Sequence, residues 1–384
     1  MSHVIDYVKN YCNVSFTEKP FCDEDNVALC MSFYMPLDKV VSPSFDDAPV
    51  PFAEACQKLY EYRGGKHKPV GLVLVKGISK LLMAMSETKR YAEMQVVACT
   101  DNYGKRPAVQ WNAATYLLPT GEVVVLFRGT DDTLIGWEED LNILTHGATP
   151  SDALALAYLE EVAKRYDGDL IVCGHSKGGY VSQYAYVNSP KEIRDRIKLL
   201  YNNDGPGLAT YDYLKGDRAI YNEMLPKYRH FIPKSSFIGM MMAHDDDFVP
   251  VRSSKITGAM QHDMLTWKFK DGKLDTAKDI AGKSKMSDLA FNAVRDNITP
   301  EQKAAMATVV GEVIEGTGQR GLLDVKANIG ATLKGGKRAY KAIDKQTKKT
   351  FKSTVKLMTK SYTKAFGTVV SGKYQPISQR LDKE

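Results

Sequence analysis

Several features that would assign this chain to a familiar class are missing from its sequence. None of its apolar runs is long enough to span a bilayer, although the chain has 384 residues. The opening stretch MSHVIDYVKNYCNV lacks the basic and apolar regions of a secretory signal, so we expect no signal peptide. The sequence has no internal repeat and no low-complexity tract, which excludes a repeat architecture.

Cysteine is scarce, and its spacing does not match a metal-binding motif. The chain has six cysteines, all in its first half and none in a CxxC pair: Cys12, Cys22, Cys30, Cys56, Cys99 and Cys173. This spacing argues against a zinc site and against a disulfide framework. We therefore expect reduced thiols and a cytoplasmic location. The sequence as a whole implies no metal or organic cofactor. Cys173 is expected to be a small buried core residue.

Positive charge is concentrated at the C-terminal end. Residues 326–384 contain 13 Lys and 2 Arg against 2 Asp and 1 Glu, a net charge of +12. Because the whole chain carries +6, residues 1–325 carry the difference, −6. The glycine-rich stretch 316–337 lies near the boundary and indicates a linker or a broken helix. A mildly acidic body is thus joined to a strongly basic tail.

Apolar runs and turn signals alternate through the body. A Pro-Thr-Gly turn at 119–121 joins two β-rich runs, which predicts a hairpin. Downstream, strands and helices alternate, with strands expected at 169–174, 197–204, 228–235 and 248–254, and helices at 152–166, 177–188 and around 211–226. This order predicts an α/β fold, with a central, mostly parallel sheet and helices on both faces.

The stretch LIVCGHSKGG carries the strongest functional signal. An apolar strand ends in Gly-x-Ser-x-Gly and a helical pattern follows, as in the nucleophile elbow of α/β-hydrolases. Glycines permit a turn too tight for side chains, so that Ser176 stands exposed above the sheet, near a helix N-terminus that favours an oxyanion. A glycine-rich turn that merely contains a serine is the alternative, but both flanks favour the elbow.

A serine nucleophile needs a histidine base, and in this fold the histidine follows the serine in the chain. Three histidines do so. His230 opens a predicted strand, where a structural role is expected. His244 ends the apolar run 235–243, predicted to be helical, and could cap it. His262 lies in a glycine-containing loop after the last predicted strand, and we predict that it is the base.

The base in turn needs an orienting acid, expected at the end of the strand before the histidine loop. The stretch HDDDFVP offers Asp245, Asp246 and Asp247, and Asp247 directly precedes the strand-like residues. We predict that Asp247 is the acid. A solvated acidic turn is the alternative, and Asp204 and Asp263 are further candidates.

An oxyanion hole needs a second amide from an earlier strand end. The strand before Arg-Gly-Thr supplies Thr130, with its N–H and its hydroxyl, and the N–H of Lys177 is the other predicted donor. We expect Arg128 and Asp140 to hold this loop by an ion pair. Trp137 is either a core residue or part of a flap over the site.

Five blocks together resemble a known family. They are FRGTDDTLIGWEEDLN, GHSKGG, YNNDGPG, PKSSFIGMMMAHDDDF and QHDMLTW. Their order is similar to that in a mostly bacterial family of lipase-like α/β-hydrolases, which is itself similar to class 3 (fungal-type) triacylglycerol lipases. The resemblance covers about residues 22–270.

The class 3 resemblance implies Ser176 as nucleophile, Thr130 as the oxyanion threonine, His262 as base and Asp247 as the acid of an Asp-x-Val-Pro block. The step from Asp247 to His262 is shorter than in class 3 lipases, so the acid departs from the family pattern. We predict a serine hydrolase of carboxylic esters, acting on lipid-like acyl esters. A catalytically silent hydrolase-fold binding module remains an alternative.

Three parts are therefore expected: an α/β-hydrolase domain (1–270), a helical extension or linker (271–325) and a basic amphipathic helical tail (326–384). In 337–366, apolar residues recur at steps of three or four among many lysines, which predicts one basic amphipathic helix. Such a helix could bind an anionic membrane, which would make the protein peripheral at the membrane, or pack on the body. In the remaining alternative the tail carries the main role, on membrane, nucleic acid or a partner, although it has no recognisable nucleic-acid module.

Overall fold

A single eight-stranded sheet crosses the described part of the body, and its spatial order follows the chain from β1 to β8. The computed structural model describes residues 2–67, 77–146, 148–208, 218–242 and 246–376. The strands are β1 (Val50–Pro51), β2 (Gln95–Lys105), β3 (Ala108–Leu117), β4 (Val123–Phe127), β5 (Leu170–His175), β6 (Ile197–Asn203), β7 (Tyr228–Pro233) and β8 (Val249–Val251). β1 to β4 pair antiparallel, and β4 to β8 pair parallel. The predicted α/β class with a mostly parallel sheet is confirmed.

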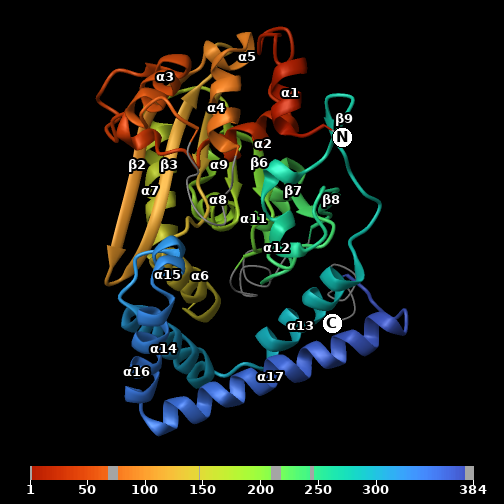
Figure 1. The fold of residues 1–384 in the computed structure, drawn as a ribbon. Helices are drawn as coiled ribbons and strands as arrows, with labels where there is room; N and C mark the ends of the chain where they lie inside the picture. The colour runs from red at the N-terminus through yellow and green to blue at the C-terminus, as the bar shows by residue number, and fades with distance from the viewer. Residues whose placement is uncertain (1, 68–76, 147, 209–217, 243–245, 377–384) are drawn as a thin grey trace.

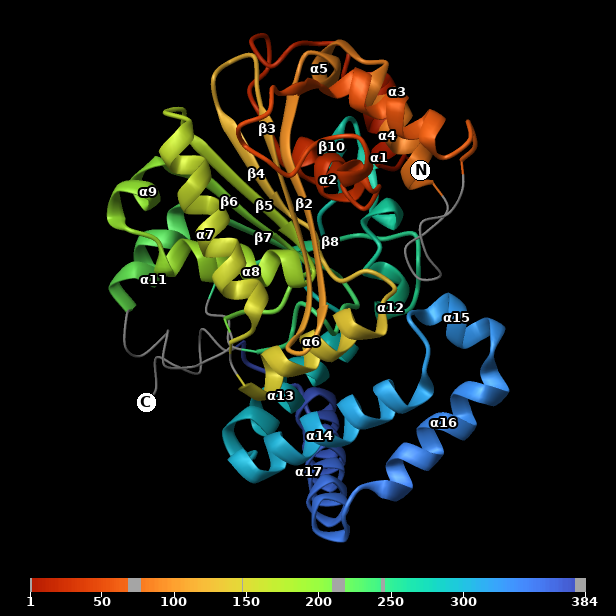
Figure 2. The same ribbon diagram turned by 90° about the vertical axis from the view of Figure 1, so that its left-hand side faces the viewer.

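Helices cover both faces of this sheet (Figures 1 and 2). They are α1 (Val4–Tyr11), α2 (Asp23–Ser32), α3 (Phe52–Tyr62), α4 (Ile78–Ser86), α5 (Lys89–Ala92), α6 (Leu134–His146), α7 (Pro150–Arg165), α8 (Lys177–Asn188), α9 (Lys191–Arg196), α11 (Arg218–Met224) and α12 (Gly258–Gln261). Successive strand residues point to opposite faces. Val124 and Leu126 therefore join the core under α1 to α4, whereas Val125 and Phe127 join the core under α7 and α8.

The predicted hairpin at 119–121 is present, whereas the predicted helix at 235–243 is not. The turn at 119–121 does join β3 and β4 as an antiparallel hairpin, with Gly121 at a φ of +97°. The apolar run 235–243 is not helical, because its described residues form turns and bends. Within it, the Gly239 N–H donates to Asp204 Oδ1 at 3.1 Å and Met240 is fully buried. The run therefore packs against Asp204 in turns instead of forming a helix.

A helical extension follows the body. After the short hairpin of β9 (Phe269–Lys270) and β10 (Lys273–Leu274), it contains α13 (Gly282–Asn297), α14 (Pro300–Thr317), α15 (Leu322–Ala327), α16 (Ile329–Ala342) and α17 (Lys345–Val370). In Figure 1 these helices lie across the lower end of the molecule. α14 ends at Gly318, whose φ of +68° suits glycine. Stretch 316–337 is thus a broken helix. No helix in the described ranges has the length and apolarity needed to cross a bilayer.

The tail is not one continuous helix over 337–366. It breaks at Ile343 and Asp344, between α16 and α17. Asp344 caps α17, because its Oδ1 accepts the N–H of Thr347 at 2.8 Å. The apolar spacing continues across the break, so periodicity alone could not locate the capping residue. α17 packs on α13 and α14, and its buried side chains, Thr354, Ser361 and Ala365, are small or short.

Candidate active site

The site is built around a strained serine. Ser176 lies between β5 and α8 with φ +57° and ψ −129°, a conformation that is costly for any residue with a side chain. The backbone around it is too crowded for side chains. A Cβ on Gly174 would lie 2.1 Å from the Gly178 carbonyl oxygen, and one on Gly178 would lie 2.1 Å from that of Phe127. The predicted strand–turn–helix at Gly-x-Ser-x-Gly is therefore present.

His262 is held by a buried carboxylate. Its Nδ1 lies 2.7 Å from Oδ2 of Asp204, whose side chain is fully buried. Asp204 follows β6, the neighbour of β5, and has a positive φ of 50°. Its other oxygen accepts the Gly239 N–H. Because the carboxylate accepts the proton on Nδ1, the Nε2 of His262 is left as the basic nitrogen.

This pairing differs from the predicted one with Asp247. Asp247 is exposed and does not line the cavity that contains His262. The sequence favours Asp247 because it directly precedes the strand-like residues, whereas the pairing of β6 with β5 places Asp204 next to the elbow. Asp263, another candidate, instead accepts the N–H of Leu265 at 2.9 Å, and burial raises its pKa to about 6.

The remaining residues of the HDDD stretch lie elsewhere. Asp246 Oδ2 is 2.8 Å from Nδ1 of His230, and both side chains are buried. His230 lies within β7, as expected for a structural histidine. His244 and Asp245 lie outside the described residues. The body therefore contains two described histidine–aspartate pairs, and only the histidine of the His262–Asp204 pair lines the same cavity as Ser176.

A second histidine, which sequence reasoning passed over, supports the first. His175 is buried directly before Ser176, and its Nε2 lies 2.9 Å from the carbonyl oxygen of His262. A carbonyl only accepts, so Nε2 carries the proton and Nδ1 accepts from the Tyr34 hydroxyl at 2.6 Å. Burial lowers the pKa of His175 well below its usual value, so the ring stays neutral. It thereby fixes the backbone of the His262 loop.

One cavity of about 300 Å³ brings together four of the predicted residues. Its lining includes Ser176, His262, Thr130 and Lys177. Most of the remaining wall is apolar, from Trp137, Leu141, Ile143, Leu144, Phe237, Ile238, Met241 and Met242. Trp137 lines this cavity and is 43% exposed, so it is not a core residue.

The loop after β4 is held differently from the expected ion pair. The Thr130 hydroxyl donates to both carboxylate oxygens of Asp140, at 2.7 and 2.8 Å. Arg128 instead donates to Asn112 at 2.6 Å and pairs with Asp131 at 3.6 Å. The Thr130 hydroxyl is therefore already engaged by Asp140. Burial raises the pKa of Asp140 to about 6.

The side chain of Lys177 is part of a buried polar network next to the elbow. Its Nζ is buried and lies 2.6 Å from Oε2 of Glu139, whose side chain is also fully buried. Oε2 of Glu139 also accepts the Gln110 N–H at 2.9 Å, and Oε1 accepts the Ser151 hydroxyl at 2.6 Å. This network joins β3, α6, α7 and α8. The backbone N–H of Lys177 belongs to the first turn of α8, where helix N–H groups have no intrahelical acceptor.

We expect Glu139→Ala to lower the free energy of unfolding by about 3–5 kcal/mol, because it leaves the Lys177 ammonium buried without a counter-charge. Urea denaturation measures the change. Asp195→Ala is the matched control, since it breaks the exposed Lys191–Asp195 pair and should have little effect. Equal losses in the two variants would contradict the role of the buried pair.

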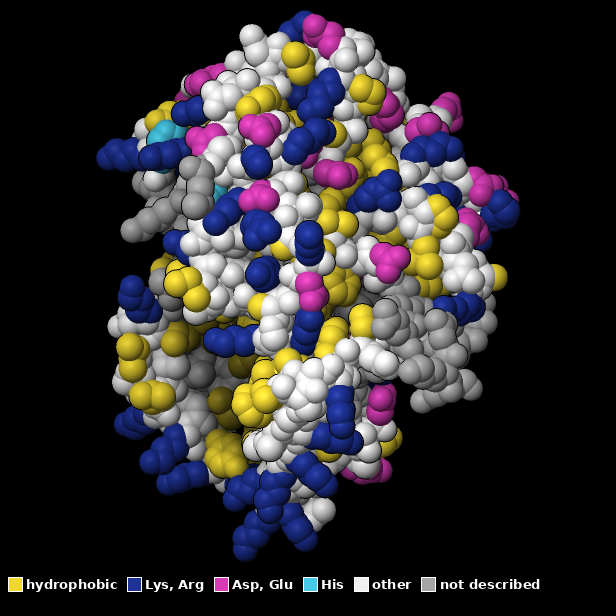
Figure 3. Space-filling view, turned by 90° about the vertical axis from the view of Figure 1, so that its right-hand side faces the viewer, with side chains coloured by type: hydrophobic (Ala, Val, Ile, Leu, Met, Phe, Trp, Pro, Cys, Tyr) yellow, Lys and Arg dark blue, Asp and Glu magenta, His cyan; other side chains and the backbone are white. Residues whose placement is uncertain are grey.

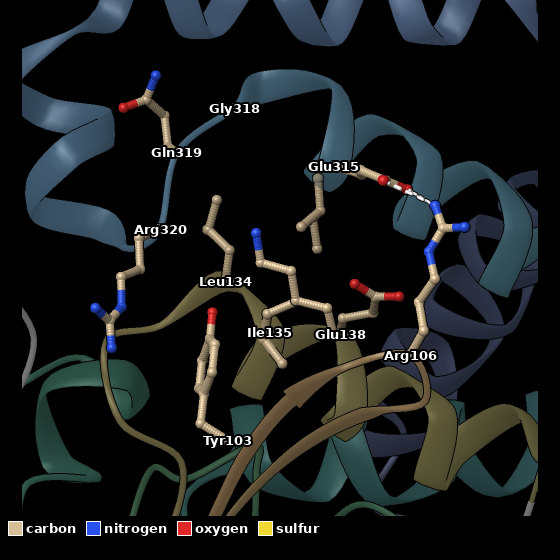
Figure 4. Close-up of a pocket in the computed structure, with 11 residues that line it drawn as sticks. Tyr103, Arg106, Leu134, Ile135, Glu138, Glu315, Gly318, Gln319 and Arg320 are labelled. Atoms are coloured by element: carbon tan, nitrogen blue, oxygen red, sulfur yellow. Dashed lines mark hydrogen bonds and ion pairs between the residues drawn. The ribbon is translucent and has the colours of Figure 1, made fainter.

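The extension contacts the loop that carries Thr130. Leu134 N–H donates to the Arg320 carbonyl at 3.0 Å, and Leu322 N–H donates to the Asp132 carbonyl at 2.9 Å. A separate cavity of about 500 Å³ lies between α6 and the end of α14, and Figure 4 shows Arg106 paired with Glu315 at its rim. α14 also packs along α6. The extension thus packs against the loop that carries Thr130 and against α6.

The described site thus combines a serine on a strained elbow with a histidine that pairs with a buried aspartate. In the described residues, no group of three or more His, Cys, Asp or Glu side chains could hold a metal ion.

A comparison with protein families gives one match. A family model described as Mbeg1-like matches residues 85–310, more than half of the chain, and so covers Ser176, Asp204 and His262. The match extends into α14, beyond the predicted domain boundary at residue 270. Searches of curated proteins and of solved structures return no match.

Proposed function

Because the chain belongs to the Mbeg1-like family, which is lipase-like, we propose that it is a serine hydrolase of carboxylic esters with an α/β-hydrolase fold. The observation that carries the proposal is the His262–Asp204 pair, whose histidine lines the same cavity as Ser176. The order serine, acid, histidine along the chain is that of α/β-hydrolases. The similarity of the FRGTDD and GHSKGG blocks to class 3 lipases belongs to this proposal as well.

In the proposed mechanism, Ser176 Oγ attacks the ester carbonyl while His262 Nε2 takes its proton. The tetrahedral oxyanion is held by the N–H groups of Thr130 and Lys177. His262 then gives the proton to the leaving alcohol, and an acyl-enzyme forms. A water molecule, activated by the same histidine, hydrolyses the acyl-enzyme and restores Ser176. Asp204 keeps the His262 tautomer and stabilises the imidazolium.

The apolar lining of the cavity supports lipid-like acyl esters as substrates. Aliphatic and aromatic side chains from α6 and from the 235–242 loop surround the space next to Ser176. Each methylene group of an acyl chain that is buried there contributes about 0.8 kcal/mol to the free energy of binding. Three aspartates, Asp131, Asp132 and Asp140, also line the wall, and Asp140 accepts the Thr130 hydroxyl. Strongly anionic acyl groups would therefore meet a wall that disfavours them.

We predict that hydrolysis of p-nitrophenyl esters by the full chain rises from acetate to longer acyl chains, until the cavity is filled. Each added methylene should raise kcat/KM by up to about fourfold, from its transfer free energy. Leu141→Trp, which narrows the cavity, should reduce hydrolysis of the longer esters and leave the acetate rate nearly unchanged. Leu141→Ala is the matched control.

Two alternatives would give other results. A catalytically silent binding module would hydrolyse no ester of the series, although it could still bind acyl compounds. A protein whose tail has the main role would show no dependence on Ser176. An equal rate for acetate and longer esters would contradict the acyl-binding role of the cavity without contradicting serine hydrolysis.

A further inference from the structure

The outer face of α17 has an unusual combination of charge and exposed apolar side chains. The helix contains seven lysines and no acidic residue. On the same helix Val355, Met358, Tyr362, Phe366 and Val370 are between 38% and 69% exposed. A helix that served only to pack on the body would bury such large side chains and expose polar ones.

The packing of α17 explains how these side chains come to be exposed. The helix contacts α13 and α14 through its short side chains, Thr354, Ser361 and Ala365. Tyr362 adds one hydrogen bond, at 2.8 Å, to Ser287 of α13. Beside this contact, an open groove is lined by Met286, Met358, Thr359, Tyr362, Thr363 and Phe366. The exposed apolar side chains of α17, which we call the apolar stripe, are Val355, Met358, Tyr362, Phe366 and Val370. The apolar stripe lies between the packed face of the helix and its lysines.

The lysines are available for an external anion. Lys352, Lys356, Lys360 and Lys364 are exposed, and none forms an ion pair with a described carboxylate. The neighbouring α16 adds Lys334, Lys337, Arg338 and Lys341 without an acidic residue. Figure 3 shows lysine and arginine side chains gathered over this end of the molecule, beside a hollow with hydrophobic side chains. Positive charge is thus concentrated on α16 and α17, and neither helix has an acidic side chain to neutralise it.

We propose that α17 is an interfacial helix that docks the protein on an anionic lipid surface. Exposed Met358, Tyr362, Phe366 and Val370 would enter the boundary between headgroups and acyl chains, while the lysines contact lipid phosphates or carboxylates. A nucleic acid would use the lysines but would leave the apolar stripe exposed to water, so it fits the face less well. No described helix can span a bilayer, so the helix lies on the surface. This inference stands independently of ester hydrolysis.

The test is co-sedimentation of the full chain with vesicles of phosphatidylcholine alone or with about one-third phosphatidylglycerol, at low and high salt. We expect binding only to the anionic vesicles, and loss of binding at high salt. Neutralising Lys352, Lys356, Lys360 and Lys364 together to glutamine should weaken binding by at least about a hundredfold, since each lysine contributes roughly fivefold. The combined Met358→Ser and Phe366→Ser variant should weaken it by about tenfold or more.

The matched control removes the same number of positive charges, but from the body instead of from α17. Replacing Lys9, Lys80, Lys164 and Lys270, all exposed on the body, with glutamine should change binding by no more than about twofold, because these charges lie away from α17 and are screened. Ser176→Ala should bind vesicles like the parent chain, which separates this inference from the proposed catalysis. Circular dichroism checks that the helices remain folded.

If the double serine variant unfolds α17, a fluorescent variant still tests the proposal. Phe366→Trp adds one indole to the three tryptophans of the chain. Its added emission should shift to shorter wavelength and be quenched by brominated lipid in anionic vesicles. Absence of quenching, or vesicle binding that depends on lysine alone and is equalled by duplex DNA, would overturn the proposal. Equal binding to neutral vesicles would overturn it too.

Discussion

Ser176→Ala is expected to lower kcat for ester hydrolysis by about 10⁴- to 10⁶-fold, as nucleophile replacements do in serine hydrolases. The oxygen that attacks the carbonyl is removed, and no described neighbour on the elbow replaces it, because Lys177 Nζ is held by Glu139. The rate is measured on the best p-nitrophenyl ester of the series, with the acetate ester as a second substrate.

The fold should survive this change. The conformation of residue 176 is imposed by the crowded backbone around Gly174 and Gly178, and alanine can occupy it as serine does. Ser182→Ala is the matched control, since Ser182 is buried on the same helix but does not line the cavity. It removes one hydrogen bond to the Gly178 carbonyl and should keep nearly full activity. Comparable rates in the parent chain and in Ser176→Ala would exclude Ser176 as the nucleophile.

Asp204→Asn is expected to lower kcat by about 10⁴-fold, the effect seen when the orienting acid of a triad becomes an amide. An amide nitrogen at the position of Oδ2 would donate a proton where the carboxylate accepts one. His262 would then carry its proton on Nε2 and could not act as a base. The buried Oδ1 could still accept the Gly239 N–H, so the loop should keep its path.

The controls for this prediction are the aspartates of the HDDD stretch. Asp247→Asn changes an exposed carboxylate and should leave kcat close to that of the parent chain. Asp246→Asn alters the pair with His230 and should affect the free energy of unfolding more than kcat. If Asp247→Asn proved the most damaging of the three, the acid would be Asp247 after all, and the Asp204–His262 contact would be structural.

Much of this fold could be predicted from local patterns. Short apolar runs bounded by turn signals located β4 to β8. The glycines around Ser176 located the elbow, because backbone crowding there excludes other residues. These features depend on residues close together in the chain. A histidine in a loop after the last strand of the body was likewise within reach of sequence reasoning.

The partner of His262 could not be chosen in the same way. Asp204 and His262 are 58 positions apart and meet only because β6 lies beside β5. One signal was present: an aspartate directly after the strand that follows the nucleophile strand. The buried network of Lys177, and the tautomer role of His175, likewise depend on contacts with Glu139 and Tyr34 that no local pattern reports.

The central claim is tested most directly by labelling with a fluorophosphonate probe, followed by intact mass measurement and peptide mapping. We predict one covalent adduct per chain, on the peptide that contains Ser176. Labelling should be absent in Ser176→Ala, strongly slowed in His262→Ala and Asp204→Asn, and unchanged in Ser182→Ala and Asp247→Asn. An adduct on another residue, or equal labelling of the parent chain and Ser176→Ala, would contradict the account.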